Sequence, residues 1–283
     1  MKYGLFGINF GACADPGTAA AVAHAAEEAG FESLWTGEHV VLPDPQLPPS
    51  PVPPHVPFLD PAVALTLVSQ HTKRVLLGTG IIILPQRNPL VLAKELASVD
   101  VVSGGRLLFG VGVGYLEPEF RALGIPFDDK GARTVDYLRA MQAIWAMDKP
   151  AYDGRYASFS GVDAYPRPLQ KPHPPIVFGG HTPAAFRRAV EMAQGWYGFA
   201  MDVDAARAAI DGIRVEEGRR QRPTEAARLE ISITPPPGIP DADTVRAYAD
   251  LGVDRLILLP AATDRNQMLD FVTAAERTLI AGI

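Results

Sequence analysis

The sequence is poor in cysteine and contains no long apolar run, and each absence excludes a class of protein. Cys13 is the only cysteine among 283 residues, so neither an intrachain disulfide nor a cysteine cage around a metal can form. No run of about 18 apolar residues occurs that would cross a membrane. Met1-Lys2 leads directly into an expected strand rather than a signal peptide. We therefore expect a soluble cytoplasmic protein with no membrane contact.

Positive charge is also scarce. The chain has 26 Lys and Arg against 32 Asp and Glu, which gives a net charge of −6. A nucleic-acid binder needs a basic face, so we expect no nucleic-acid partner. Apolar residues make up 47% of the chain, enough for a sizeable core. Because the composition shows no internal break and α/β barrels often run as one unit, we expect residues 1–283 to form a single domain.

The clearest local pattern lies in the segment Lys73–Asp100. Residues 75–84 are apolar on both faces and predict a buried strand, and Asn88-Pro89 predicts a capped helix start after a short loop. The middle of the strand, residues 78–80, lacks bulky side chains. We interpret this gap as a bare stretch of backbone against which a flat group lies.

The same unit of strand, loop and helix repeats along the whole chain. Eight such units predict a parallel sheet with right-handed crossovers that closes into a (β/α)8 TIM barrel. A doubly wound open sheet is the alternative, but no glycine-rich dinucleotide fingerprint follows the first strand. The expected strands cover residues 3–8, 33–36, 75–84, 107–111, 176–178, 196–200, 229–233 and 255–259.

Two segments interrupt this alternation. Residues 40–60, after the second strand, are dense in proline, which blocks helix and inner strand. A solvated linker would fit, but apolar residues such as Val56 and Phe58 favour an ordered lid or wall over a pocket. Residues 152–159, before the fifth strand, predict a small hairpin with its turn at Asp153-Gly154.

Functional residues of such barrels lie where strands end and helices begin. His39 directly follows the second strand, next to Glu38. A histidine can donate or accept a proton near pH 7, and a neighbouring carboxylate shifts that balance. A histidine that only hydrogen-bonds its loop would give the same pattern. Glu38, His39 and His181 lack the spacing of metal ligands, and we predict no metal.

Two further loops at the same rim are rich in glycine. Gly179-Gly180-His181-Thr182 follows the fifth strand at a helix start, where free N–H groups and the Thr182 hydroxyl can bind a phosphate. A capped turn without a ligand is the alternative. Gly112 and Gly114 follow the fourth strand and precede Tyr115. Together with residues 78–80, they suggest two neighbouring strands cleared for a planar group.

These motifs occur together, and in this order, in one known family. The chain resembles the luciferase-like monooxygenase superfamily in residues 35–39, 78–94, 103–114, 172–175 and 179–180. The resemblance implies a (β/α)8 barrel, usually a homodimer, that binds FMN or the deazaflavin coenzyme F420. The Gly-Val-Gly-Val-Gly-Tyr sequence at 110–115 and the short chain look more like the F420-dependent oxidoreductase branch.

The resemblance also implies roles for individual residues. A non-proline cis peptide bond is implied at Gly80–Ile81, behind the coenzyme ring. His39 is implied to be the proton donor or acceptor, with Glu38 beside it where some relatives carry Asp. The residues implied to contact the coenzyme are Thr79, Gly80, Ile81, Gly112, Gly114 and Tyr115 around the ring, and Gly179, Gly180, His181 and Thr182 around its phosphate.

We therefore expect an F420-dependent oxidoreductase that transfers a hydride between the deazaflavin C5 and a small organic substrate. An FMN-dependent monooxygenase served by a separate flavin reductase is the alternative among enzymes. A flavin- or deazaflavin-binding protein without turnover is the alternative from another class. Basic residues for a substrate phosphate cannot be placed, so no sugar-phosphate substrate is predicted.

Overall fold

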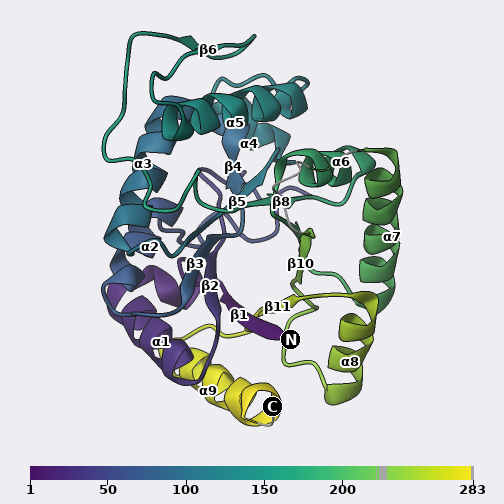
Figure 1. Ribbon diagram of the computed structural model, residues 1–283. Coiled ribbons are helices and arrows are strands. Elements are labelled where there is room, and N and C mark those ends of the chain that lie inside the picture. The colour runs from purple at the N-terminus through teal and green to yellow at the C-terminus, as the bar shows by residue number, and fades with distance from the viewer. Residues whose placement is uncertain (221, 223–227, 282–283) are drawn as a thin grey trace.

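Eight parallel strand positions form a closed ring with helices around it, as Figure 1 shows along the barrel axis. The computed structural model describes residues 1–220, 222 and 228–281. Pairing of β3 with β5 closes the ring, so the predicted (β/α)8 barrel is confirmed. Its strands are β1 (Lys2–Phe6), β2 (Ser33–Thr36), β3 (Leu76–Thr79), β4 (Ile82–Ile83), β5 (Leu107–Gly112), β8 (Ile176–Gly179), β9 (Gly195–Gly198), β10 (Glu230–Ile233) and β11 (Arg255–Leu258).

The third position of the ring is split into two short strands. β3 pairs with β2, whereas β4 runs alongside the end of β5. The Gly80–Ile81 peptide bond between them is cis, as the family resemblance implied.

The helices begin at capping residues that are visible in the sequence. Asp15, Asp60 and Asn88 each accept a hydrogen bond from backbone N–H groups of the first turn, and a proline follows each of them. The helices are α1 (Pro16–Glu28), α2 (Pro61–Ser69), α3 (Pro89–Val102), α4 (Glu117–Ala122), α5 (Lys130–Ala146), α6 (Pro183–Met192), α7 (Val203–Arg219), α8 (Ala242–Leu251) and α9 (Arg265–Ala275). Among the described residues, no helix combines the length and apolarity that a membrane crossing requires.

Apolar side chains form two clusters, one on each side of the sheet. The larger lies between strands and helices and includes Leu34 of β2. The smaller fills the barrel interior and includes Trp35, the next residue of the same strand. This alternation follows from the two-residue period of a strand. The interior cluster consists of Phe6, Trp35, Leu108, Val177, Tyr197 and Ile257.

The bare backbone expected at residues 78–80 is not found. A Cβ atom on Gly78 would overlap the indole of Trp35, and one on Gly80 would lie 2.8 Å from the Thr36 carbonyl oxygen. These glycines make room for a large side chain inside the barrel and for close strand packing. The interpretation of this stretch as an empty face was therefore wrong, because the partner that fills it comes from the neighbouring strand.

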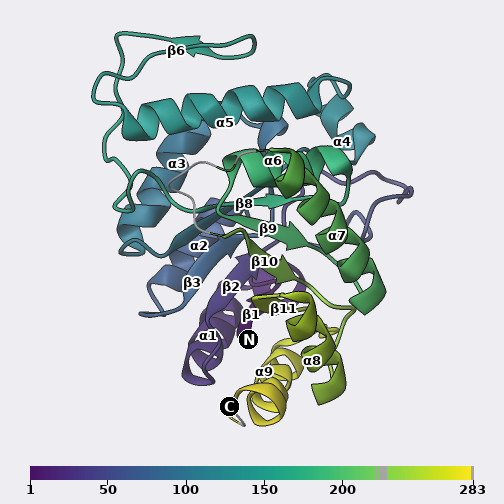
Figure 2. The ribbon, with the colours of Figure 1, turned by 45° about the vertical axis from the view of Figure 1, so that its right-hand side comes forward.

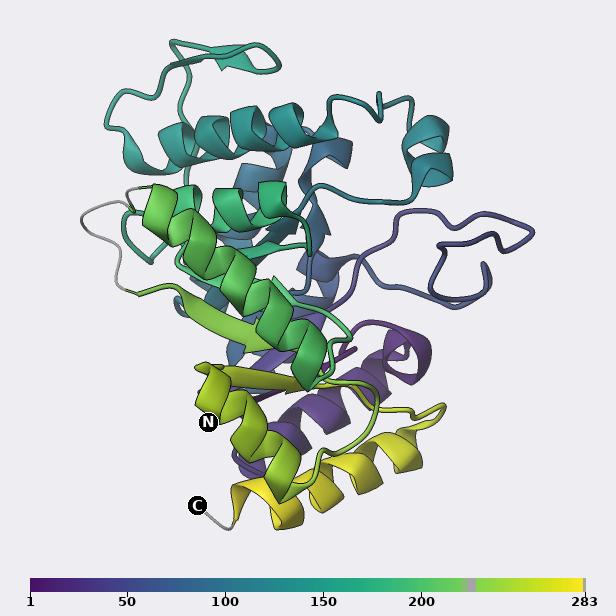
Figure 3. The same ribbon diagram turned by 90° about the vertical axis from the view of Figure 1, so that its right-hand side faces the viewer.

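Both predicted insertions lie outside the ring of strands and helices. The hairpin forms from β6 (Tyr152–Asp153) and β7 (Ser158–Phe159), and it lies beyond α5 in Figure 2. Its turn covers residues 154–157, closed by a 2.9 Å bond from Gly154 N–H to the Ala157 carbonyl, so Asp153 belongs to the strand rather than to the turn. The proline-rich loop contains neither helix nor strand, and it projects from the barrel in Figure 3.

Candidate active site

The loop that carries His39 is held in place by Asn9, which is fully buried in the loop after β1. The Asn9 amide accepts a 2.8 Å hydrogen bond from the Gly37 N–H and donates 2.9 Å to the Gly37 carbonyl. It also donates 2.7 Å to the Leu59 carbonyl, at the end of the proline-rich loop. The Asn9 side chain therefore fixes Gly37, which lies two residues before His39, and Leu59, near the C-terminal end of the proline-rich loop.

The imidazole of His39 lies between an acid and a phenol. Its Nδ1 is 3.3 Å from Oε2 of Glu119, a fully buried residue on α4, and its Nε2 is 3.4 Å from the Tyr115 hydroxyl. The other Glu119 oxygen accepts a 2.6 Å bond from the Val40 N–H. Glu119 thus binds both the ring of His39 and the backbone that follows it.

The electrostatic setting keeps Glu119 ionised. Burial alone would raise the pKa of Glu119, but the hydrogen bond and charge of His39 and the Val40 N–H together lower it below its usual value. A carboxylate only accepts hydrogen bonds, so the His39 Nδ1 donates to Glu119, and the Nε2 of the same ring faces the Tyr115 hydroxyl. Burial, and then the charge of Glu119, raise the pKa of Tyr115, which keeps its hydroxyl protonated. This row of groups can accept or deliver a proton at Nε2.

Glu38 has different partners from those its position beside His39 suggested. Its carboxylate accepts a 2.8 Å bond from Arg87 Nε and bonds from Arg87 Nη2 and the Ile83 N–H. Arg87 also donates 2.7 Å to Asp60, at the start of α2. Glu38 therefore links the ends of β2 and β4 through a buried ion pair. The carboxylate in contact with His39 is Glu119.

Aromatic side chains line the barrel mouth next to His39. Phe58 of the proline-rich loop stacks on Phe10 at 5.0 Å between ring centroids and meets the His39 ring edge-on at 5.9 Å. Phe6 links Phe10 to Phe199, with centroid distances of 5.8 and 5.1 Å. Phe199 is 37% exposed and Tyr115 is 49% exposed. An accessible aromatic wall of this kind suits a flat apolar ligand.

The glycines of the neighbouring strands surround the side chain of Ile81. A Cβ atom on Gly112 would overlap Cδ1 of Ile81, and one on Gly179 would lie 2.6 Å from it. The expectation that two neighbouring strands are cleared for a planar group also needs correction. As at residues 78–80, a side chain fills the space, and here it is the side chain of Ile81. The hydroxyl of Thr79 is also engaged, since it donates 2.7 Å to the Gly110 carbonyl.

The loop from Gly179 to Thr182 has the form of an anion site. Gly180 has φ +120°, and a Cβ atom there would lie 2.9 Å from Cβ of Ala185, so only glycine fits. The Thr182 hydroxyl caps α6 by accepting 3.3 Å from the Ala185 N–H, and His181 and Thr182 are both exposed. His181 Nε2 accepts 3.2 Å from the Phe199 N–H, and partial desolvation of the ring, although the residue is exposed at the surface, lowers the pKa of His181. The ring of His181 thus ties this loop to the aromatic wall.

The barrel therefore brings together only some of the residues predicted from the sequence. His39 and Tyr115 meet, whereas Glu38 faces Arg87 and the glycine loop after β8 forms a separate part of the mouth. Asn9 and Glu119 were not predicted from the sequence. Glu119 lies in a short helix after the fourth strand, at the rim where functional residues gather, and that position was the available signal. In the described part of the chain, no three His, Cys, Asp or Glu side chains group as metal ligands would.

A profile of the luciferase-like monooxygenase family matches residues 5–273. The chain belongs to the luciferase-like monooxygenase family. Family membership makes it an oxidoreductase. His39, Tyr115 and Glu119 lie at the rim of the barrel where functional residues of this fold are generally found.

Three known proteins resemble this chain in sequence or in fold. The chain is 31% identical over 272 residues to the uncharacterized protein Rv0953c of Mycobacterium tuberculosis, and the match covers 91% of each. It is 33% identical over 132 residues to an FMNH2-dependent dimethylsulfone monooxygenase of Pseudomonas putida, covering 46% of this chain and 36% of that protein. The structure of an F420-dependent secondary alcohol dehydrogenase superposes with a TM-score of 0.78 at 16% identity over 97% of both chains, which shows a shared fold.

Proposed function

We propose that this luciferase-like protein is an F420-dependent oxidoreductase that transfers a hydride between the coenzyme and a small organic substrate. The observation that carries the proposal is the row Glu119–His39–Tyr115 at the barrel mouth. It places a proton donor or acceptor beside an accessible aromatic wall. A carbonyl substrate that gains a hydride must also gain a proton, and an alcohol that loses a hydride must lose one.

The residues at the mouth fit a flat coenzyme with an anionic tail. Exposed faces of Tyr115 and Phe199 can pack on a ring system, with Ile81 below it in the barrel. The glycine backbone at Gly180 and the hydroxyl of Thr182, at the start of α6, can take a phosphate. When bound, F420 would exchange a hydride at C5, whereas FMN would also permit reaction with oxygen.

Each protein group then has a defined task. His39 Nε2 exchanges the substrate proton, and Glu119 orients the ring through Nδ1 and stabilises its protonated form. Asn9 and the pair of Glu38 with Arg87 position the loop that carries His39. The aromatic wall excludes water from the reacting atoms.

Chain length supports F420 over FMN. Among superposed structures, the F420-dependent dehydrogenase is covered over 97% of its length and the FMN-bound oxygenating constituent of 3,6-diketocamphane monooxygenase from Pseudomonas putida over 83%. An FMN-dependent monooxygenase remains the second candidate because the FMNH2-dependent dimethylsulfone monooxygenase shares 33% identity over the matched part. In that case a separate flavin reductase would be the expected partner.

Equilibrium titration of the full-length protein with F420 and with FMN, followed by absorbance and fluorescence, tests the coenzyme. We expect F420 to bind with a Kd in the micromolar range or below, at least about tenfold more tightly than FMN. Thr182→Ala should weaken the binding of F420. Thr273→Ala, which changes an exposed threonine of α9, should leave that binding unchanged. Tighter binding of FMN would favour the monooxygenase, and binding of neither coenzyme would reject both candidates.

Turnover is measured separately, with reduced and oxidised F420 against panels of aldehydes, ketones and alcohols. We expect His39→Ala to retain coenzyme binding and to lose most turnover, by roughly two orders of magnitude. Unchanged turnover in that variant would remove His39 from the mechanism. We also propose that the protein is a homodimer, and light scattering of the purified chain measures its mass in solution.

A further inference from the structure

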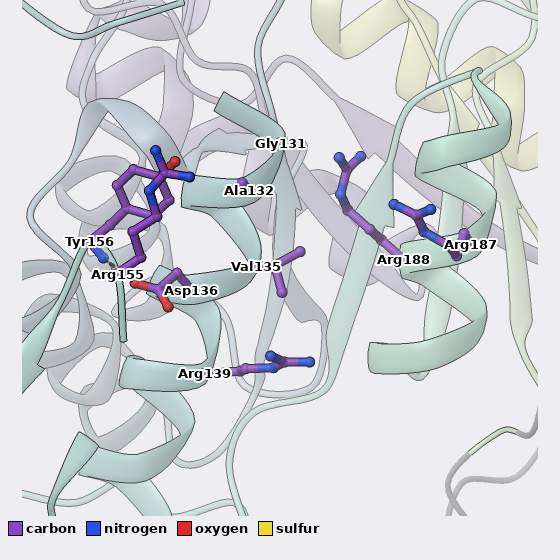
Figure 4. Close-up of a pocket in the computed structure, with 9 residues that line it drawn as sticks. All are labelled: Gly131, Ala132, Val135, Asp136, Arg139, Arg155, Tyr156, Arg187 and Arg188. Carbon is purple, nitrogen blue, oxygen red and sulfur yellow. Dashed lines mark hydrogen bonds between the residues drawn. The ribbon is translucent and has the colours of Figure 1, made fainter. Parts of the chain in front are cut away.

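A second pocket, rich in arginine, lies on the outside of the barrel. It has a volume of about 390 Å³ and spans the first turns of α5, the hairpin turn and the middle of α6. Figure 4 shows the α5 residues between those of the hairpin and those of α6. None of its residues belongs to the loops at the barrel mouth. Four arginines line it: Arg139 of α5, Arg155 of the hairpin turn, and Arg187 and Arg188 of α6.

Within the described residues these four arginines form no ion pair, and the charge of Arg187 interacts only at longer range with Glu216 of α7. The pocket has one acidic residue, Asp136, and its carboxylate is already engaged. Asp136 accepts 2.8 Å from the Tyr152 hydroxyl, 2.7 Å from the Tyr156 N–H and 3.0 Å from the Ala157 N–H. It therefore fastens the hairpin turn to α5 rather than neutralising the arginines.

The pocket is built by close packing. The Nη2 end of Arg188 presses on Gly131, where a Cβ atom would overlap it, so a glycine in the first turn of α5 admits the guanidinium. The Nε of Arg188 and the hydroxyl of Tyr156 are buried, and neither has a hydrogen-bond partner among the residues that the structure describes. Buried polar atoms are normally paired, so two unpaired polar atoms among the residues that line the pocket are unusual. Burial, and then the charge of Arg187, lower the pKa of Arg188, which is consistent with uncompensated repulsion.

We propose that this pocket binds a small polyanion that carries two or more phosphate or carboxylate groups. Guanidinium groups bind both kinds of anion through paired N–H donors, and four of them around one cavity favour several anionic groups over one. The chain as a whole has a net charge of −6, so the cluster is a local exception that general electrostatics does not explain. The proposal is independent of the coenzyme and of the reaction at the barrel mouth.

Isothermal titration calorimetry of the full-length protein with tripolyphosphate and with citrate tests the site. It also distinguishes phosphate ligands from carboxylate ligands. We expect a Kd below about 1 mM for the better probe at an ionic strength near 50 mM, and weaker binding as salt rises. Tighter binding of tripolyphosphate assigns the site to phosphates, and tighter binding of citrate assigns it to carboxylates.

A matched pair of double variants locates the binding. Arg139→Gln with Arg188→Gln should weaken the better probe at least about tenfold. Arg214→Gln with Arg246→Gln removes the same charge from exposed positions of α7 and α8 and should change the Kd less than about twofold. Equal effects of both pairs, or no binding of either probe to the unmodified protein, would overturn the proposal.

The melting temperature, measured without a ligand and with tripolyphosphate, gives a second readout. Arg139 is exposed and makes no hydrogen bond in the described part of the chain, so Arg139→Gln should fold normally. We expect its melting temperature to rise slightly, because one of four repelling charges is removed, and tripolyphosphate to raise it less than in the unmodified protein. A lower melting temperature, with an undiminished response to tripolyphosphate, would contradict the proposal.

Discussion

Nδ1 of His39 lies 3.3 Å from Oε2 of Glu119, although 80 residues separate them in the sequence. The same carboxylate accepts hydrogen bonds from the Val40 and Val41 N–H groups at 2.6 and 3.3 Å. A single acid on α4 therefore sets the orientation of the ring and the path of the loop after β2. Its removal should affect proton transfer first.

Replacement of Glu119 by glutamine should lower turnover by at least about tenfold, with little change in coenzyme affinity. The amide is neutral and cannot stabilise a protonated His39 ring. The pH dependence of kcat should also change, because the negative charge beside the His39 ring is lost. Glu117→Gln, on the exposed side of the same short helix, is the matched control. If both variants behave alike, Glu119 has no special relation to His39.

Stability should depend on pH through the same carboxylate. The pKa of Glu119 is lower in the folded protein than its ordinary value of 4.5, since the hydrogen bonds from His39 and Val40 outweigh the effect of burial. The resulting stabilisation is therefore fully present above pH 4.5 and is lost as the pH falls through the lower, folded pKa.

Urea unfolding of the unmodified protein and of Glu119→Gln, at several pH values from 7 down to 3.5, measures this effect. We expect the difference in the free energy of unfolding to be constant near neutral pH and to shrink below about pH 4.5. A difference that stays constant over the whole range would mean that Glu119 does not stabilise the fold through its charge.

Asn9→Ala should reduce both stability and turnover. The variant loses three hydrogen bonds in a fully buried position, which costs about 1–3 kcal/mol of unfolding free energy, and it releases the backbone before His39. Asn88→Ala removes the cap of α3 and should cost about 1 kcal/mol without reaching the site. Chemical unfolding and kcat are measured for both. Comparable turnover in the two variants would show that Asn9 has only a general structural role.

The packing of Ile81 between glycines predicts a coupled pair of substitutions. Gly112→Ala forces a Cβ atom onto Cδ1 of Ile81 and should destabilise the protein by about 1–3 kcal/mol. Ile81→Val removes that Cδ1, so the double variant should lose less than the sum of the two single changes. Gly218→Ala, in the open surroundings of α7, should be neutral or stabilising by up to about 1 kcal/mol. Strict additivity in this double-mutant cycle would mean that the two residues do not touch.

The sequence by itself was sufficient for the barrel and for its order of elements. The strand at residues 33–36 has the bounds expected from its pattern, and Asp15-Pro16, Asp60-Pro61 and Asn88-Pro89 mark helix starts. Strand and helix periods, caps and breakers are local properties, so they can be recognised without knowing which elements touch.

Only the tertiary structure decided which side chains meet. The sequence placed Glu38 beside His39, but β2 turns Glu38 to Arg87, and α4 brings Glu119 to the ring. Glycines that looked like an empty surface instead receive Trp35 and Ile81. Contacts of this kind depend on how the strands close into a ring and on where each side chain then points. The sequence determined the elements and the rim that carries the site, whereas barrel closure determined the partners, because those partners lie far apart along the chain.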